Sequence, residues 1–109
     1  MDLLELELVE LSPPVLVVQG EIDLSTTDQL RAALRRAVDH DPDVRIDLTG
    51  LTFIDAAGPR VFLDVAQSLD GGGPLRLVNA PLVARLLDLV GLRDLASIEI
   101  CSEEPFHGR

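Results

Sequence analysis

The sequence predicts an α/β domain in which a mixed β-sheet packs against helices, and two observations lead to this class. First, segments with the period-two pattern of strands and segments with the period of helices follow one another in the order β-β-α-β-α-β-α-β. Such an order predicts a mixed sheet with helices over at least one face. Second, apolar residues make up 47% of the chain and are mainly aliphatic, with no Trp or Tyr. This composition suits a sheet packed on helices.

Two strands are expected at the start of the chain. Over residues 4–9 leucines alternate with glutamates, which is typical of a half-buried strand. Residues 12–14, Ser-Pro-Pro, supply a turn, and residues 15–18 form a second apolar run that ends at Gln-Gly. The short separation of the two runs predicts an antiparallel hairpin.

A first helix is expected after this hairpin. Ser25 as N-cap, with Asp28 three residues later, resembles a capping box and predicts the start of the helix there. Residues 40–42, His-Asp-Pro, stop it. The residues with the spacing of one helical face are Leu30, Ala33, Leu34, Ala37 and Val38.

The second half of the chain repeats a strand-then-helix pattern. Val44, Ile46 and Leu48 predict a third strand, residues 49–51 a connection, and a second helix follows Gly58. The apolar stripe of that helix is Val61, Phe62, Val65, Ala66 and Leu69. A glycine run at residues 70–74 ends it.

A fourth strand, a third helix and a fifth strand complete the predicted domain. Residues 75–78 form the strand, residues 79–81 turn into the helix, and Gly91 fits the position just past its end. The apolar face of this helix is Leu82, Val83, Leu86, Leu87 and Val90. Residues 97–101 read as the last strand.

Length and composition place these elements in one domain. A chain of 109 residues has the size of a single domain with one core, so we expect a domain over residues 1–101 and a flexible tail over residues 102–109. The single Cys101 excludes an intramolecular disulfide, and a reducing cytoplasm is the simplest location. No apolar run approaches the roughly 20 residues that span a bilayer. The acidic start is expected to be neither a signal peptide nor an anchor.

The net charge of the chain restricts its partners. The formal charge is −10 and is spread along the sequence rather than held in a tail. Phosphate backbones attract proteins that offer clusters of Lys and Arg, so direct binding to nucleic acid is not expected. A basic or neutral protein surface is the expected partner, because complementary charge speeds encounter.

Residues 52–60, Thr-Phe-Ile-Asp-Ala-Ala-Gly-Pro-Arg, join the third strand to the second helix and are the best candidate for a site. Asp55 lies near the positive end of the helix dipole, and it either contacts a partner or caps the helix. Asp23 is expected at the same end of the sheet, as part of an acidic patch or as a solvated turn carboxylate. Small residues after Asp55 would let the surface of a partner approach.

Catalytic and metal-binding readings find little support in the sequence. Asp23 and Asp55 suggest a general acid and base or a magnesium site, but no His, Lys or third ligand stands at motif spacing. His40 and His107 lack ligand spacing, and Cys101 in a strand is expected to be an inert apolar residue. We therefore predict no enzyme activity, no metal and no cofactor, and keep a cation or nucleotide held by the two aspartates as an alternative.

Together these features resemble the STAS family, typified by bacterial anti-sigma factor antagonists. Residues 20–26 (Gly-Glu-Ile-Asp-Leu-Ser-Thr) look like the second strand and first helix start of the family. Residues 46–55 (Ile-Asp-Leu-Thr-Gly-Leu-Thr-Phe-Ile-Asp) look like its signature, and residues 89–92 (Leu-Val-Gly-Leu) like the end of its third helix. The resemblance covers nearly the whole chain and implies a single STAS-like domain.

The resemblance also implies a regulatory switch that this chain has lost. In antagonists of the family, the residue after the signature Asp is a Ser or Thr that is phosphorylated by a serine kinase, which is also the anti-sigma factor. Here that position is Ala56, so phosphorylation cannot occur at the usual place. The hydroxyls of other residues nearby are alternatives, although they also serve turns and caps: Ser25, Thr26, Thr27, Thr49 and Thr52.

The function implied by the resemblance is a non-enzymatic interaction module that binds an anti-sigma factor/serine kinase in the control of a sigma factor. The expected partner-binding residues are Asp23, Thr52, Asp55, Ala56, Ala57, Gly58, Arg60 and Phe62. An accessory subunit of an ABC-type lipid transporter, or of a stress-sensing assembly, is the alternative function. The oligomeric state stays open, with a homodimer among the options.

Overall fold

The structure is a computed structural model that describes residues 4–69, 74–89 and 97–101. The predicted tail at 102–109, the glycine run at 70–73, and the helix end at Val90 and Gly91 lie outside the described residues. Among the described residues, no helix is both long enough and apolar enough to cross a bilayer.

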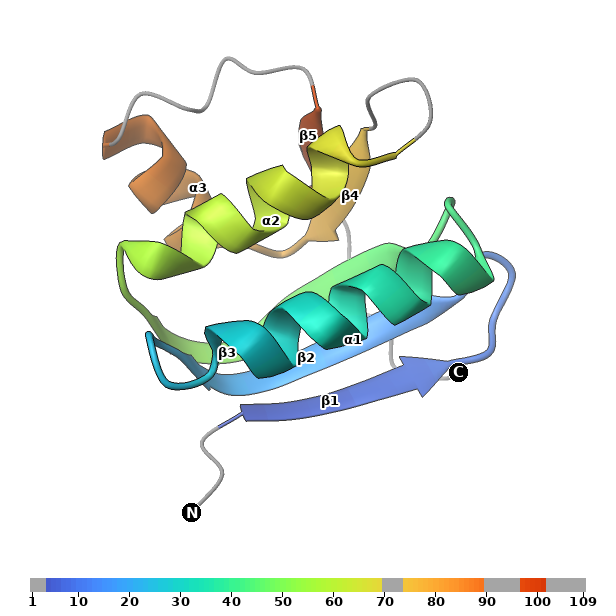
Figure 1. The fold of residues 1–109 in the computed structure, drawn as a ribbon, viewed down its shortest axis with the longest axis horizontal. Helices are drawn as coiled ribbons and strands as arrows, with labels where there is room; N and C mark the ends of the chain where they lie inside the picture. Colours follow the sequence, from blue (N-terminus) through green and yellow to red (C-terminus); the bar gives the residue numbers. More distant parts are fainter. Residues whose placement is uncertain (1–3, 70–73, 90–96, 102–109) are drawn as a thin grey trace.

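One five-stranded sheet and three helices make up the fold (Figure 1). The strands are β1 (Leu4–Val9), β2 (Val15–Ile22), β3 (Arg45–Ile54), β4 (Leu75–Val78) and β5 (Ile98–Cys101). The helices are α1 (Thr27–His40), α2 (Ala57–Gln67) and α3 (Pro81–Leu89). The strands lie side by side in chain order, with β1 antiparallel to β2 and all other pairs parallel. The predicted order of elements and the mixed sheet are therefore confirmed.

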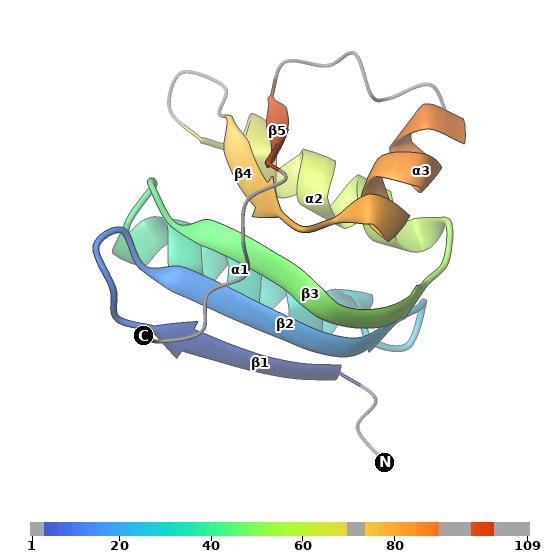
Figure 2. The same ribbon diagram turned by 180° about the vertical axis from the view of Figure 1, so that it is seen from behind.

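The core lies between the sheet and the helices. Figure 1 shows α1 and α2 side by side on one face of the sheet. Figure 2 is the view from the other side, in which the strands lie in front of these two helices. An ion pair joins these two helices, with Nη1 of Arg31 3.0 Å from Oδ2 of Asp64, and both residues are half-buried. The largest fully buried side chains come from every layer: Phe62, Leu4, Ile22, Leu30, Leu34, Ile46, Leu75, Leu77 and Leu87. The predicted apolar stripes of α1 and α2 therefore face the sheet.

The third strand is longer than predicted, because the connection expected at residues 49–51 is part of β3. The parallel neighbour explains the difference, since β2 pairs with β3 as far as Ile22 and Ile54. The ladder is irregular where Gln19 lies opposite Gly50. A Cβ at Gly50 would lie only 2.8 Å from Cγ of Gln19, so a larger residue at this position would require the Gln19 side chain to move.

The capping box expected at Ser25 does not form. Helix α1 begins at Thr27, and the N-cap residue Thr26 makes no side-chain capping bond. The hydroxyl of Ser25 instead donates to Oδ1 of Asp23 at 2.6 Å. The buried Thr26 hydroxyl accepts the backbone N–H of Asp23 at 2.9 Å. These side chains therefore shape the turn before the helix rather than the helix end.

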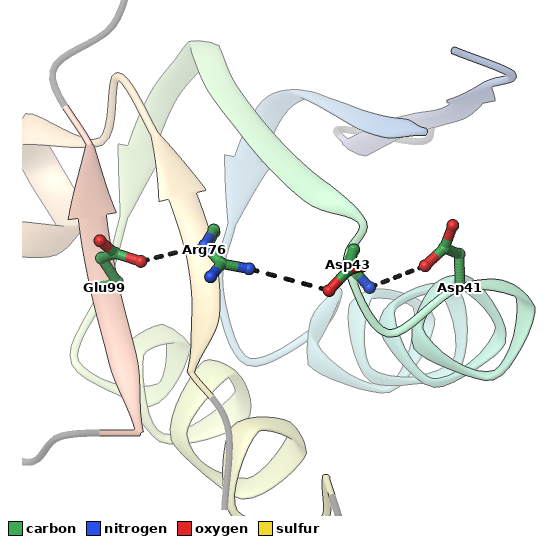
Figure 3. A network of polar contacts seen from close by, with 4 residues as sticks. All are labelled: Asp41, Asp43, Arg76 and Glu99. Carbon is green, nitrogen blue, oxygen red and sulfur yellow. Dashed lines mark hydrogen bonds and ion pairs between the residues drawn. The ribbon is translucent and has the colours of Figure 1, made fainter. Parts of the chain in front are cut away.

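A polar network connects β4, β5 and the turn before β3 at the end of the sheet where these three parallel strands begin (Figure 3). Nε of Arg76 on β4 lies 3.0 Å from Oε1 of Glu99 on β5, and its Nη1 lies 4.0 Å from Oδ1 of Asp43. Oδ1 of Asp41 accepts the N–H of Asp43 at 2.8 Å. Such exposed ion pairs contribute about 0–1 kcal/mol each. They link the turn after α1 to β4 and β5.

Phe62 and Phe53 differ in burial, so their substitution by alanine should affect the stability of the protein differently. Phe62 on α2 has an exposed fraction of 0%, whereas Phe53 on β3 is 48% exposed. Phe62→Ala should lower the free energy of unfolding by about 3–5 kcal/mol, because it leaves a cavity in the core. Phe53→Ala, the matched control, should lower it by less than about 1 kcal/mol. Urea unfolding measures both, and equal losses would contradict the placement of Phe62 in the core.

Candidate functional site

The carboxyl ends of β2 and β3 bring the two predicted aspartates to one end of the sheet. Ile22 pairs with Ile54, so Asp23 and Asp55 each follow the last residue of neighbouring parallel strands. The backbone N–H of Asp55 donates to the carbonyl oxygen of Ile22 at 3.0 Å, which extends the pairing one residue further. Asp23 and Asp55 therefore leave the sheet side by side, as predicted.

Asp55 is also bonded to the first turn of α2. Its Oδ1 accepts the backbone N–H of Ala57 at 2.9 Å, and its carbonyl oxygen accepts the N–H of Gly58 at 3.0 Å. The carboxylate thereby satisfies one of the donors that a helix start leaves unpaired, close to the positive end of the helix dipole. Between Asp55 and the helix, Ala56 is the N-cap residue and is exposed. The local capping reading of Asp55 is confirmed, and this role fixes the position of Ala56.

Asp23 is held as a carboxylate by the turn that follows it. Its Oδ1 accepts the hydroxyl of Ser25 at 2.6 Å and the backbone N–H of Ser25 at 2.9 Å. The hydrogen bond from the Ser25 hydroxyl is the largest influence on the pKa of Asp23 and lowers it. Desolvation is the next largest influence and raises the pKa, while the backbone N–H groups of Ser25 and Thr26 lower it further, so that the pKa lies below its ordinary value. Asp23 therefore contributes a negative charge to this end of the sheet at neutral pH.

Two residues of the predicted partner-binding set belong to the interior. The side chain of Phe62 is fully buried, so its assignment to a contact surface was wrong: it lies one helical turn beyond Gly58, on the face that packs against the sheet. Gly58 is buried as well, and a Cβ there would lie 2.5 Å from Cδ1 of Ile54. The small size of Gly58 therefore serves the approach of α2 to β3, not the approach of a partner.

The remaining predicted residues reach the surface at this end. Ala56 is exposed just before α2, Arg60 is exposed on α2, and Ala57 is half-buried. Thr52 is exposed on β3, and its hydroxyl donates to the carbonyl oxygen of Gly20 at 3.0 Å. Of the other hydroxyls considered for phosphorylation, Ser25 and Thr49 are exposed, whereas Thr26 and Thr27 are buried.

Two apolar residues at this end were missed by the sequence reasoning. Leu24 is 79% exposed in the turn after Asp23, and Phe53 is 48% exposed two residues before Asp55. The sequence could have indicated their exposure, because each is a large apolar residue close to an aspartate at a strand end and neither belongs to the apolar stripe of a helix. We define the junction surface as Asp23, Leu24, Phe53, Asp55 and Ala56. It combines exposed apolar area with two carboxylates, which is the chemistry of a protein contact rather than of a deep ligand pocket.

The structure gives no support for a metal centre in the part of the chain that it describes. Within residues 4–69, 74–89 and 97–101, no group of three or more His, Cys, Asp or Glu side chains is arranged to hold a metal ion. Asp23 and Asp55 are each bonded to local donors of their own turns.

The bonding of Asp23 predicts a pH-dependent effect of Ser25. The pKa of Asp23 should lie below its ordinary value of 3.8, and Ser25→Ala should raise it toward that value by removing the donated hydroxyl bond. A depressed pKa adds stability above the unfolded-state value and loses it as the pH falls through the folded-state value. The stability difference between the two proteins should therefore be present at pH 7 and vanish in strong acid.

NMR titration of the Asp23 carboxyl carbon measures this pKa directly. Ser68→Ala is the matched control, because the hydroxyl of Ser68 donates to the carbonyl of Val65 on another element. An Asp23 pKa that is the same in wild type and Ser25→Ala would contradict the assignment.

Comparisons with known proteins extend this picture. A family model described as "Mlab, STAS domain" matches residues 9–98. The anti-sigma-B factor antagonist of Bacillus subtilis (strain 168) is 33% identical over 88 residues, which cover 79% of this chain and 81% of that protein.

Two solved structures share the fold at lower identity. An anti-sigma factor antagonist from Mycobacterium paratuberculosis superposes with a TM-score of 0.77 at 22% identity, covering 92% of this chain and 86% of the other. The anti-sigma factor antagonist SpoIIAA in its unphosphorylated form gives a TM-score of 0.63 at 22% identity, with 92% and 89% covered. With the family model over residues 9–98 and the Bacillus relative, these matches show that the chain belongs to the STAS domain family.

Proposed function

We propose that this protein is a non-enzymatic regulatory module of the cytoplasm that binds an anti-sigma factor with serine kinase activity through the junction surface. The 33% identity to an anti-sigma-B factor antagonist over most of both chains supports the regulatory class. The observation that carries the proposal is the position of Ala56, exposed between the carboxylate of Asp55 and the first turn of α2. This is the position at which the family resemblance places the phosphorylated residue.

The composition of the junction surface supports a protein partner. Leu24 and Phe53 offer exposed apolar area in a domain whose other large apolar side chains are mostly buried. Burying such area contributes roughly 25 cal/mol per Å². Asp23 and Asp55 are near these residues in the sequence, and the whole chain carries a net charge of −10. A partner surface with an apolar centre and basic groups around it is the complement, and the charges would raise the rate of encounter.

The alanine at position 56 makes this binding independent of phosphorylation at that position. A phosphate would add about −1.5 to −2 charges between Asp55 and the partner, which would repel an acidic contact and be hard to desolvate. Ala56 has no hydroxyl to accept a phosphate, so the bound state is controlled by the amounts of the two proteins or by another signal. A constitutive antagonist is the functional consequence.

A second candidate function is an accessory subunit of an ABC-type lipid transporter or of a stress-sensing assembly. The observation that favours it is the matched family model, which carries the description "Mlab, STAS domain". A permanently docked subunit also has no need of a phosphorylated residue at position 56. Affinity purification of the chain from its own cells separates the two functions, since recovery of an ATPase and a permease in place of a serine kinase would favour the transporter.

A charge placed at position 56 should disrupt the complex. Ala56→Asp adds a third carboxylate to the junction surface and should raise the Kd for the anti-sigma factor at least tenfold, or about 1.4 kcal/mol. Ala32→Asp is the matched control, because Ala32 is exposed on α1 and lies outside the junction surface. Calorimetry with the purified anti-sigma factor encoded nearby measures both, and equal affinities of the two variants would exclude the junction surface as the contact.

Restoring a hydroxyl at position 56 should restore the covalent switch. With the partner kinase and ATP, Ala56→Ser should take up close to one phosphate per chain, while the wild-type chain should take up little. Mass spectrometry identifies the modified residue. Stoichiometric phosphate on Thr52 of the wild-type chain would overturn the proposal that binding is unswitched.

A further inference from the structure

Within the described part of the chain, the second half of β3 has a strand neighbour on one edge only. β2 pairs with β3 from Arg45 to Ile54, whereas β4 pairs with it only from Arg45 to Asp47. Figure 2 shows β3 continuing past the end of β4, with α3 beside this continuation. Among the residues that the structure describes, no strand pairs with residues 48–54 of β3 on that side. Main-chain groups on such an edge are a template for another extended chain.

An apolar cavity of about 290 Å³ lies directly beside this edge. Its walls are Thr49 and Leu51 of β3 on one side, and Asn79, Ala80, Pro81 and Leu82 at the start of α3 on the other. Only Thr49 and Asn79 are polar among these residues. The volume is near the lower limit for small-molecule pockets, and it suits one or two apolar side chains rather than a cofactor.

Short polar bonds hold the cavity open. Asn79 has a φ of 54°, in the left-handed region, and directs the chain away from the line of β4 into α3. Its Nδ2 donates to Oγ1 of Thr49 at 3.2 Å, and Oγ1 of Thr49 donates to Oδ1 of Asp47 at 2.6 Å. Oδ1 of Asp47 also accepts the N–H of Thr49 at 2.9 Å, and Asp47 is buried. Because these walls are fixed before binding, an occupant would lose less entropy in ordering them.

We propose that this groove, formed by the open edge of β3 and the start of α3, binds an extended segment of a partner protein as an added strand. The main chain of the segment pairs with β3, and one apolar side chain enters the cavity. Pairing with an open strand edge selects an extended peptide, and alternate side chains of such a peptide face the same side. Seven residues of β3 offer about 23 Å of edge. The edge ends at Asp55, so a basic residue at that end of the bound segment would pair with the carboxylate of Asp55.

The proposal goes beyond the proposed function, because the groove lies along the edge of β3 beside the start of α3 and meets the junction surface only at Phe53 and Asp55. It does not depend on an anti-sigma factor as the partner. The experiment therefore uses a random 12-residue peptide library displayed on phage and panned on the full chain. We expect enrichment of peptides in which apolar residues alternate with polar or basic ones. Absence of enrichment would overturn the proposal.

An enriched peptide, made synthetically, then tests the location of binding by calorimetry. Leu82→Lys places a charge in the wall of the cavity, and Pro81→Trp fills its mouth from an exposed position at the first residue of α3. Each should raise the Kd at least tenfold. Leu89→Lys is the matched control, because Leu89 lies on the same helix, is exposed and does not line the cavity. Its Kd should stay within twofold of wild type.

Spectroscopy then shows where the peptide binds and whether it binds as a strand or as a helix. Far-UV circular dichroism first confirms that each variant is folded, and if Leu82→Lys is not, Pro81→Trp at the surface decides the outcome. On binding, the amide NMR signals of residues 48–54 should shift, and amides of the bound peptide should be protected from exchange as in a strand. Equal affinity for all variants, shifts confined to the junction surface, or a helical bound peptide would each overturn the proposal.

Discussion

The parallel pairing of β2 with β3 is the constraint on which the rest of the structure depends. It runs the whole length of both strands and ends with the bond from the N–H of Asp55 to the carbonyl of Ile22. Because the two strands end at the same level, the turns that follow them leave the sheet together. Helix α2 can then begin at once, and Gly58 lets it approach Ile54 and Ile22 closely. Each feature of the junction surface follows from this shared strand end.

The pairing of β2 with β3 is associated with two exposed surfaces, one at the strand ends and one along the other edge of β3. At the strand ends Leu24 and Phe53 stay exposed, close in sequence to Asp23 and Asp55. Along the other edge of β3, β4 is shorter than its neighbour and gives way to α3, which leaves an open strand edge and a cavity. The opposite end of the sheet differs, because Arg76 forms ion pairs there with Glu99 and Asp43. The second half of β3 therefore has an edge without a strand partner in the described residues on one side and the exposed side chain of Phe53 near its end.

Local periodicity was enough to predict the order of elements, but not the features that depend on distant pairing. Residues 49–51 resemble a turn because they contain Gly50, and only the neighbouring β2 shows that they continue a strand. Ser25 resembles an N-cap, but Asp23 two residues earlier competes successfully for its hydroxyl. Phe62 was misassigned by its closeness to Asp55 in sequence, although its own helical stripe predicted burial. The groove had no sequence signal, because it arises from the different lengths of β3 and β4.

The two proposed surfaces would contribute differently to the binding of a partner. The junction surface is exposed and charged, so its contribution falls mainly on the rate of encounter and weakens with salt. The groove is apolar and held open by fixed polar bonds, so an inserted side chain would mainly slow dissociation, where most differences in affinity arise. A partner with a basic patch and a neighbouring extended segment would use both at once. The second contact would then form at a high effective concentration, without any new surface on this domain. Such a partner would stay bound by packing and main-chain pairing, which suits a chain whose residue 56 cannot be phosphorylated.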